Sequence, residues 1–313
     1  MAIGERLQSL WSGYGEIRRA TLFTAVETPV IVKYVVPPAA AEATRNPAEA
    51  RSHRRKLRSY QVERAFYENY AARATVECRL PAPLQLSADS GRLLFILEDL
   101  DAAGFGLRKS RISALELRAC LRWLAAFHAT FMSVLPEQLW KVGSYWHLAT
   151  RPDELQALSD NELRRAAARI DERLNRAHFQ TLVHGDAKLQ NFCFSKNPER
   201  VAAVDFQYVG AGVGVKDVAY LLTSALSSRE LSSDAGSYLD DYFHELAHAL
   251  RARSASEPPI DVSALEAEWR ALYPLACADF YRFLAGWAAG AASQERYLAS
   301  VTRAVLDDPS LTR

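Results

Sequence analysis

TLVHGDAKLQNFCFSKNPERVAAVDFQ, the stretch from residue 181 to residue 207, alternates short apolar runs with polar groups. The runs are rich in β-branched and aromatic residues, which predicts strands at 181–183, 192–194 and 201–204. These strands are expected to form a small hairpin. Polar residues flank the strands, so that the carboxylates of Asp186 and Asp205 and the amide of Asn191 should reach the same end of the hairpin.

This set of side chains has the chemistry that phosphoryl transfer from ATP requires. Transfer needs a carboxylate that accepts the proton of a hydroxyl, and oxygen ligands that hold Mg²⁺ on the phosphates. We expect Asp186 to be the base, or to orient the substrate hydroxyl, and Asn191 and Asp205 to bind Mg²⁺. Lys188 is expected to neutralise the transferring phosphoryl group, whereas His184 is expected to have a structural role. The alternative is that the acids only end turns and strands and that Lys188 faces solvent.

A lysine inside an apolar strand provides a second signal. Lys33 lies within the run VIVKYVV, residues 30–36, where an unpaired ammonium would be costly. Glu63, in a predicted helix, is the expected partner, and Glu68 competes with it. Such a pair would direct Lys33 towards the phosphates of a nucleotide. The alternative is a lysine whose long stem carries its charge to water at the strand end.

Two glycines precede the first predicted strand pair. Gly13 and Gly15 in SGYGEI, residues 12–17, allow the backbone to approach a phosphate closely and to point N–H groups at it. An ordinary loop explains two such glycines equally well, so only their position ahead of Lys33 favours a nucleotide site.

A basic run follows at residues 45–58. Its members are Arg45, Arg51, His53, Arg54, Arg55, Lys56 and Arg58. The run is expected either to grip phosphates or an anionic substrate, or to be the solvated face of a helix. It does not predict nucleic-acid binding, because no aromatic residues interleave the charges.

Composition restricts the class of protein. The chain has 313 residues, with 38 Lys and Arg against 37 Asp and Glu, and a net charge of +1. This balance gives no general attraction to nucleic acid or anionic membrane. The start has no signal-peptide pattern, and no run approaches the roughly 18 apolar residues of a membrane span. We therefore expect a cytoplasmic protein without a membrane or protein partner. Its four cysteines are expected to be buried thiols, since their spacing fits neither a zinc site nor a disulfide framework.

The length predicts two lobes, and the expected elements change from mainly strands to mainly helices near residue 100. The expected elements before it are strands at 20–26 and 29–36 with a turn at 27–29, a helix at 48–74 and a strand at 92–97. After it, Ser113 is the expected N-cap of a helix, and helices are expected at 153–179 and from 237 to 305, with a break at 257–259. The predicted domains are therefore 1–100, with a linker at about 97–101, and 101–313.

Taken in order, these motifs resemble the aminoglycoside phosphotransferase and choline kinase superfamily, and most closely its ecdysteroid-kinase-like (CHK-kinase-like) branch. The matching pieces run from residue 12 to residue 222: the glycine loop SGYGEI, Lys33, Val62-Glu63 with Phe66-Tyr67, Leu97-Glu98-Asp99-Leu100, His184-Gly185-Asp186 to Asn191, Val204-Asp205-Phe206-Gln207, and Asp217-Val218-Ala219-Tyr220-Leu221-Leu222.

The resemblance implies an α+β, bilobal protein-kinase-like fold. Its N-lobe is a small antiparallel sheet with one main helix, and its C-lobe is larger and mainly helical. The resemblance also implies that Lys33 contacts ATP phosphates, that the linker Leu97, Glu98, Asp99 and Leu100 receives adenine, and that Asp217 braces the catalytic loop. Lys188 departs from many small-molecule members, which have an aromatic residue or His there.

The expected activity is an ATP- and Mg²⁺-dependent transfer of the γ-phosphoryl group to a small alcohol. Only about a dozen residues separate Asp205 from Asp217, too few for a long protein-kinase activation loop, which favours a small-molecule acceptor. The acceptor is expected to be choline-like, aminoglycoside-like or sterol-like. The C-terminal residues that are expected either to line its pocket or to be plain core are Trp269, Tyr273, Asp279, Phe280, Tyr281 and Trp287. The alternatives are a non-catalytic nucleotide-binding regulator and a metal-dependent phosphate-ester hydrolase.

Overall fold

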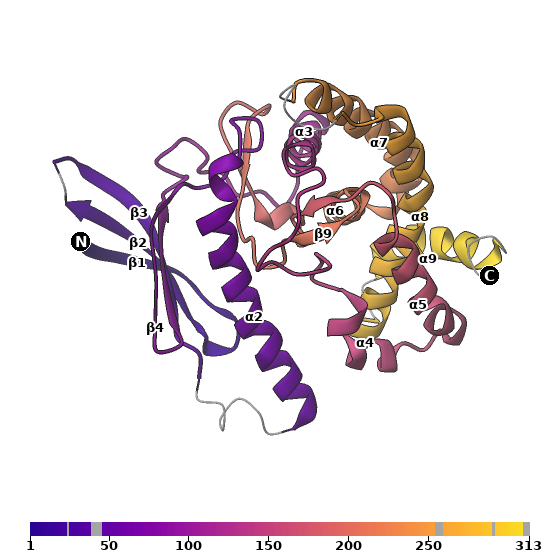
Figure 1. The fold of residues 1–313 in the computed structure, drawn as a ribbon, viewed down its shortest axis with the longest axis horizontal. Coiled ribbons are helices and arrows are strands. Elements are labelled where there is room, and N and C mark those ends of the chain that lie inside the picture. The colour runs from indigo at the N-terminus through magenta and orange to yellow at the C-terminus, as the bar shows by residue number, and fades with distance from the viewer. Residues whose placement is uncertain (24, 39–45, 254–258, 290–291, 309–313) are drawn as a thin grey trace.

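The computed structural model describes residues 1–23, 25–38, 46–253, 259–289 and 292–308, and the α+β class predicted from the sequence is confirmed (Figure 1). The first hundred residues form a five-stranded antiparallel sheet with one long helix against it, in the strand order β1-β2-β3-β5-β4. The bounds are β1 Ala2–Ser9, β2 Gly15–Phe23, β3 Glu27–Val35, α2 Pro47–Asn69, β4 Pro83–Asp89 and β5 Arg92–Glu98, with 3-10 turns at Trp11–Gly13 and Ala71–Arg73.

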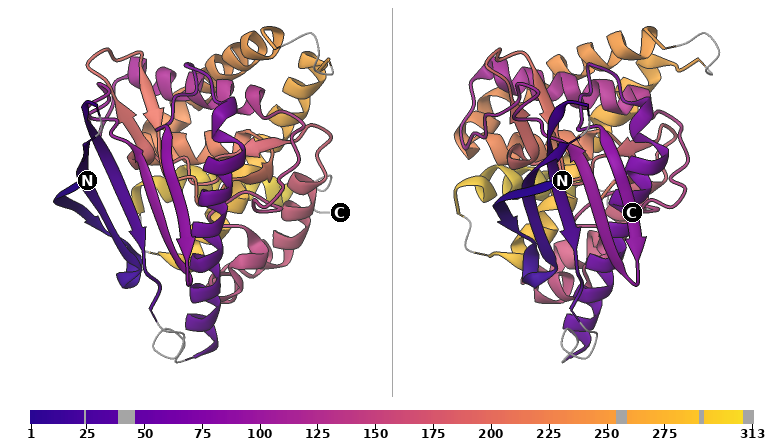
Figure 2. Two further views of the ribbon diagram at one scale, coloured as in Figure 1. Left: turned by 60° about the vertical axis from the view of Figure 1, so that its left-hand side comes forward. Right: turned by 90° about the vertical axis from the view of Figure 1, so that its left-hand side faces the viewer.

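The alternation of side chains along β3 decides what each face of the sheet contacts. Val30 and Val32 pack with Ala20 and Ile96 in a small cluster on the outer face. Lys33 projects from the other face, because successive strand residues point to opposite sides. Figure 2 shows α2 lying along that inner face. The sheet therefore presents Lys33 to the helix.

The remainder of the chain is mainly helical and lies on the far side of α2 from the sheet (Figures 1 and 2). Its helices are α3 Ala114–Thr130, α4 Pro152–Ala157, α5 Asn161–Asn175, α6 Val215–Ala225, α7 Ser228–Arg251, α8 Val262–Trp287 and α9 Ala292–Asp307, with 3-10 turns at Leu148–Thr150 and Leu189–Asn191. The predicted N-cap Ser113 is present, and it forms a capping box with Glu116.

Four short strands sit among these helices: β6 Thr181–Val183, β7 Phe192–Phe194, β8 Val201–Ala203 and β9 Gly210–Gly212. The three strands predicted from the opening stretch are confirmed. Strands β7 and β8 form the expected hairpin, whereas β6 pairs with β9, which the sequence did not predict.

Some element boundaries differ from the prediction. The expected turn at 27–29 is wrong, because these residues begin β3 and Pro29 pairs with Thr21 of β2. The pairing of β3 with β5 begins only at Val30, so the missing N–H of Pro29 is not needed on that side. The predicted helix at 48–74 ends earlier, at Asn69, and the break predicted at 257–259 lies partly outside the described residues.

One hydrophobic core joins the sheet–helix part to the helical part. At its centre, the ring of Phe66 on α2 stacks on the ring of Phe206 with 4.4 Å between centroids. The four cysteines, Cys78, Cys120, Cys193 and Cys277, are free and buried, as predicted. The division into domains at residue 100 stays a prediction.

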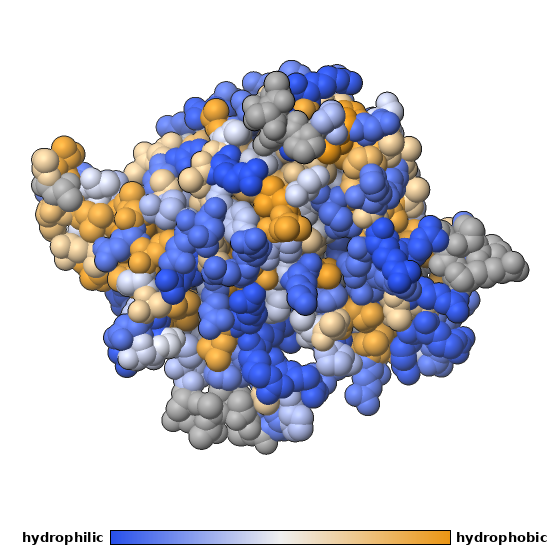
Figure 3. Space-filling model, viewed as in Figure 1, coloured by the Kyte–Doolittle hydropathy of each residue, from blue (hydrophilic) through white to orange (hydrophobic). Residues whose placement is uncertain are grey.

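The surface is mixed in polarity (Figure 3). Apolar side chains gather at the far end of β2 and β3, where Phe23 is 58% exposed and Val26 is 70% exposed. None of the helices that the structure describes has the length and apolar content that crossing a membrane takes.

Candidate active site

The loop after β6 is held in place by one buried carboxylate. Asp217, in the first turn of α6, accepts the backbone N–H of His184 at 2.6 Å and that of Gly185 at 2.9 Å. The Nε2 of His128 lies 3.1 Å from the same carboxylate, and its Nδ1 lies 2.8 Å from the hydroxyl of Tyr242. These contacts fit a His128 ring that donates from Nε2 to Asp217 and accepts at Nδ1 from Tyr242. The side chain of Asp217 is completely buried, so it acts on the loop rather than on a ligand.

The loop also requires a glycine and a histidine. Gly185 has φ 77°, and a Cβ atom there would collide with the backbone carbonyl of Tyr208. The ring of His184 bridges the loop to the strand beyond, because Nε2 lies 3.1 Å from the carbonyl oxygen of Val204 and Nδ1 accepts the N–H of Asp186. Burial lowers the pKa of His184, in agreement with a neutral ring. Both hydrogen bonds of the ring are to backbone groups, which fits the structural role expected of His184.

Asp186 lies at the tip of this loop and is 4% exposed. Its Oδ2 accepts hydrogen bonds from Lys188 Nζ and Asn191 Nδ2, both at 3.0 Å. Burial, with repulsion from Asp205, raises the pKa of Asp186 to about 6, although Lys188 and Asn191 act in the opposite direction. Burial would lower the pKa of Lys188, but attraction to Asp186 outweighs it and raises that pKa. The loop thus contains a carboxylate that takes up a proton more readily than an exposed one.

Asp205 approaches the loop from the other side. It follows β8 with φ 71°, a left-handed conformation that Asp tolerates better than most residues. Its side chain is 35% exposed, and its Oδ1 lies 4.0 Å from Lys33 Nζ. The next residue, Phe206, is fully buried, so the turn at Asp205 places one side chain in the core and the other at the site.

Lys33 forms the ion pair predicted from the sequence. Its Nζ lies 2.7 Å from Glu63 Oε2, and both side chains are almost completely buried. Burial, together with repulsion from Asp205, raises the pKa of Glu63 to about 7, although Lys33 acts in the opposite direction. The competing partner Glu68 instead accepts a hydrogen bond from Arg64 one helical turn away. Lys33 therefore lies between the carboxylates of Glu63 and Asp205.

Two carboxylate oxygens at the site lack a hydrogen-bond donor, and that of Asp205 fits a divalent cation. Asp186 Oδ1 and Asp205 Oδ1 are buried and have no hydrogen-bond partner of normal length, although Tyr220 is close enough to Asp186 to interact with it. Hard cations such as Mg²⁺ prefer oxygen ligands, and a buried carboxylate oxygen without a donor is costly. Within the described residues, no three His, Cys, Asp or Glu side chains gather to hold a metal, so the predicted Mg²⁺ would rest on Asp205 and the amide oxygen of Asn191.

Gly13 lies between β1 and β2, and Gly15 is the first residue of β2. Gly15 has φ 129°, and a Cβ there would collide with the carbonyl of Tyr34 in β3, so strand packing already explains this glycine. Gly13 has φ 74° with open space around it, which leaves it free of such a constraint. On the helix side, Lys56 Nζ donates to Ser12 Oγ at 2.6 Å and links the loop to α2.

The predicted linker is tied down through its side chains. Glu98 pairs with Arg79 and accepts the N–H of Ala82, while Asp99 lies 3.1 Å from Arg19 Nε. The carbonyls of Asp99 and Leu100 accept N–H groups from the following turn, and Leu97 lies within β5. The described contacts of Glu98 and Asp99 thus fix the linker, and adenine binding by Leu97–Leu100 stays a prediction about its backbone.

Part of the basic run on α2 contacts the helical part of the chain rather than water, and anion binding by the run stays a prediction. Arg51 pairs with Asp153, Arg55 donates to the carbonyl of Thr150 at 3.1 Å, and Arg58 donates to the carbonyl of Leu139 at 2.9 Å. These contacts bridge α2 to the helical part of the chain. Arg45 lies outside the described residues.

The residues proposed as an aromatic pocket are mostly core. Trp269 is completely buried and donates to the carbonyl of Phe179, and Asp279 accepts the indole N–H of Trp146 at 3.0 Å. Among them, Trp287 is 59% exposed. Sequence reasoning gave no functional role to Tyr220, whose hydroxyl interacts with Asp186, and it did not identify His128 as a partner of Asp217.

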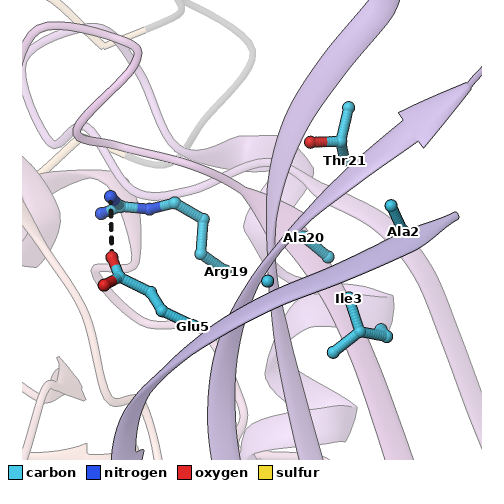
Figure 4. A pocket seen from close by; sticks show the side chains of 7 residues that line it. Ala2, Ile3, Glu5, Arg19, Ala20 and Thr21 are labelled. Carbon is cyan, nitrogen blue, oxygen red and sulfur yellow. Dashed lines mark hydrogen bonds and ion pairs between the residues drawn. The ribbon is translucent and has the colours of Figure 1, made fainter.

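Two surface hollows do not include the Asp186 loop. The hollow shown in Figure 4 is lined by residues of β1 and β2. Two of these residues, Arg19 and Glu5, pair with each other. A second hollow lies among Arg58, Trp140 and His147. Neither hollow contains the Asp186 loop. The candidate site is marked instead by the charged side chains of Lys33, Asp186 and Asp205 that converge there.

Comparisons with known proteins concern the sequence profile and the fold of the chain. Residues 37–255 match the sequence profile of the phosphotransferase enzyme family. The matched residues include the Asp186 loop and Asp205 but not Lys33. No curated protein matches the chain in sequence.

Three solved structures are similar in fold. One is the GDP complex of wild-type aminoglycoside 2'-phosphotransferase-IIIa, at 10% identity, covering 97% of this chain and 93% of that one, with a TM-score of 0.51. A provisionally assigned aminoglycoside phosphotransferase from Ralstonia eutropha JMP134 has 14% identity, coverage of 96% and 88%, and a TM-score of 0.51. The ethanolamine kinase of Plasmodium vivax has 10% identity, coverage of 98% and 83%, and a TM-score of 0.50. At these identities the likeness establishes the fold.

Proposed function

Because the chain belongs to the phosphotransferase enzyme family, we propose that it moves the γ-phosphoryl group of ATP to a hydroxyl of a small organic molecule. The observation that supports this proposal best is the convergence of two charged groups of residues. Lys33 and Glu63 meet Asp205 from the sheet side, and Asp186 with Lys188 comes from the loop after β6.

Each residue then has a distinct role. Asp186 accepts the proton of the acceptor hydroxyl, which its raised pKa favours. Lys188 neutralises charge that develops on the transferring group, and Lys33 holds the nucleotide phosphates. Asn191 and Asp205 would hold Mg²⁺, which supplies positive charge to the β- and γ-phosphates when bound.

Supporting residues keep these groups in position. Asp217 and His184 fix the loop that contains Asp186, and Glu63 keeps Lys33 directed into the site. The segment with Gly13 and Gly15 would cover the phosphates, and the backbone of the linker after β5 would receive the base. The division into a nucleotide-binding part up to residue 100 and a catalytic part beyond it follows from this assignment.

The test is an ATP-consumption assay over a panel of alcohols, amino alcohols, sugars, sterols and hydroxy acids, with and without Mg²⁺. Wild-type protein should release ADP only when an acceptor is present. Asp186→Ala should abolish release while Mg-ATP still binds, and Asp205→Ala should weaken metal-dependent nucleotide binding. Asp234→Ala, at an exposed position on α7, is the matched control.

The outcomes separate the rival functions. A non-catalytic nucleotide binder would be stabilised by Mg-ATP without turnover, and a phosphate-ester hydrolase would act without nucleotide. Undiminished turnover by Asp186→Ala would show that the base is another group.

A further inference from the structure

Two guanidinium groups lie beside the Asp186 loop, and the roles assigned above do not use them. The N–H of Tyr145 donates to the carbonyl of Gly185 at 2.7 Å, which joins the segment of Tyr145 to the loop. Arg151 Nε in turn donates to the carbonyl of Tyr145 at 2.8 Å. The guanidinium of Arg151 is thus separated from the backbone of the loop by a single hydrogen-bonded residue.

Arg55 of α2 reaches the same place from the opposite side. Its Nη1 donates to the carbonyl of Thr150, the residue before Arg151. Burial, and after it repulsion from Arg151, lowers the pKa of Arg55. Two positive charges are therefore held near each other where water is partly excluded.

The hydrogen-bonding capacity of the pair is unfilled. Arg151 is 2% exposed, yet its Nη2 has no partner, and Arg55 Nε is also buried without one. The carboxylate of Glu154 lies 3.1 Å from Arg151 Nη1 and balances one of the two charges. An oxyacid group would supply the missing acceptors and the second negative charge, since guanidinium groups match such groups in geometry.

Aromatic rings connect this pair to the reacting end of the site. The guanidinium of Arg151 lies 4.1 Å from the ring centroid of Tyr145, and the rings of Tyr145 and Tyr208 meet edge to face at 5.0 Å. Burial raises the pKa of Tyr208, and the two arginines and Asp186 all act on its hydroxyl. Tyr208 is therefore near both the guanidinium groups and the candidate base.

The nucleotide itself is the wrong occupant for these arginines. Arg55 precedes Glu63 by eight residues on α2, which places them about 12 Å apart along the helix axis. Glu63 holds Lys33, the proposed phosphate ligand. Phosphates bound at Lys33 are thus displaced by more than two helical turns from the arginine pair.

We propose that the acceptor has an anionic oxyacid group, a carboxylate in the first place, which Arg55 and Arg151 bind while the acceptor hydroxyl meets Asp186. The inference rests on the proposed function, since it assigns the acceptor side of the same site. It replaces the cationic, choline-like or aminoglycoside-like acceptor with a hydroxy acid.

Two matched sets of probes test the charge of the acceptor. The first is 4-hydroxybutanoate, 4-hydroxybutanamide and 4-aminobutan-1-ol, and the second is 4-(hydroxymethyl)benzoate with its amide and the corresponding benzylamine. Binding to the full-length protein is measured by calorimetry with Mg²⁺ and a non-hydrolysable ATP analogue. In at least one set, the carboxylate should bind about tenfold or more tightly than the amide, and the amine most weakly.

Variants assign the preference to the two arginines. Arg55→Gln should remove the preference for carboxylate over amide, whereas Arg54→Gln, at the neighbouring exposed position, should retain it. Arg151→Gln should remove the preference in the same way. Arg151→Lys, which preserves the charge, should retain part of the preference and is the variant to use if Arg151→Gln does not fold. Equal or tighter binding of amide or amine in both sets, an unchanged preference in Arg55→Gln, or no carboxylate binding at all would overturn the proposal.

Failure of the phosphotransfer proposal gives a different result. Carboxylate binding that depends on Arg55, without ADP release from ATP, would retain the anion site and remove the proposed reaction. ADP release with neutral or cationic probes alone would retain the reaction and remove the anion site.

Discussion

Asp217→Asn tests whether one buried carboxylate holds the catalytic loop. The change preserves the volume of the side chain but replaces one of two acceptor oxygens with an NH₂ group. In its best orientation, the amide oxygen still accepts from His184 N–H and His128, which share Asp217 Oδ2. The NH₂ group then faces the N–H of Gly185, whose bond at 2.9 Å is lost.

The expected loss follows from these contacts. One hydrogen bond to a charged group contributes about 1.5–3 kcal/mol, and the remaining two weaken because their acceptor is no longer charged. Relief of burying a charge offsets part of this loss, since the carboxylate is completely buried. We expect the free energy of unfolding to fall by about 2–4 kcal/mol, or the melting temperature by roughly 3–6 °C.

Urea unfolding and hydrogen exchange measure the effect. The amide of Gly185 should exchange faster in Asp217→Asn, and the midpoint of unfolding should fall. Asp241→Asn is the control, because Asp241 pairs with Arg118 at a position that is 36% exposed and should cost less than about 1 kcal/mol. If Asp217→Asn matched this control in stability and in exchange at Gly185, the bracing role would be refuted.

Three further predictions concern separate parts of the molecule. Lys33→Met should weaken ATP-analogue binding in calorimetry by about tenfold or more, while Lys196→Met, an exposed control, should not; equal affinities would contradict the phosphate role. Gly15→Ala should lower the free energy of unfolding in urea by about 3 kcal/mol, against about 1 kcal/mol for Gly13→Ala, which meets no neighbouring atom, and the reverse order would be inconsistent with the strand clash. Burial would raise the pKa of Glu116, but hydrogen bonds from Lys109 and Ser113 outweigh it and lower that pKa below 4.5. Glu116→Gln should therefore be less stable than wild type at neutral pH, and the difference should disappear as pH falls through the lowered pKa, because wild type then loses the same stability. A difference in the free energy of unfolding that stayed constant down to pH 2 would disprove this.

Local signals explain which parts of the fold the sequence predicted. Strands β6, β7 and β8 were predicted because short apolar runs are set off by polar residues, and the Lys33–Glu63 pair because an apolar strand cannot leave a charge unpaired. Strand β1 was missed since every residue in it is exposed, so that no apolar alternation marks it.

Long-range contacts explain what was not predicted. Arg55 and Arg58 meet backbone carbonyls of residues that lie 95 and 81 positions away, and a carbonyl leaves no trace in the amino-acid sequence. Arg151 has no local pattern either, because its neighbours Tyr145 and Phe283 come together only through packing. These contacts follow from how the helices pack, which periodicity alone does not determine.

The left-handed backbone at Asp205 restricts how this position can change by mutation. Only Gly, Asn and Asp adopt such a conformation readily, so most replacements would cost folding energy as well as chemistry. Asn is an exception: it retains the shape and the backbone preference, and a single base change converts an Asp codon into an Asn codon. A copy of this gene could therefore lose the negative charge at residue 205 while its product still folds. The fold therefore does little to prevent the replacement of a residue on which the proposed chemistry depends, because the product with Asn at this position still folds.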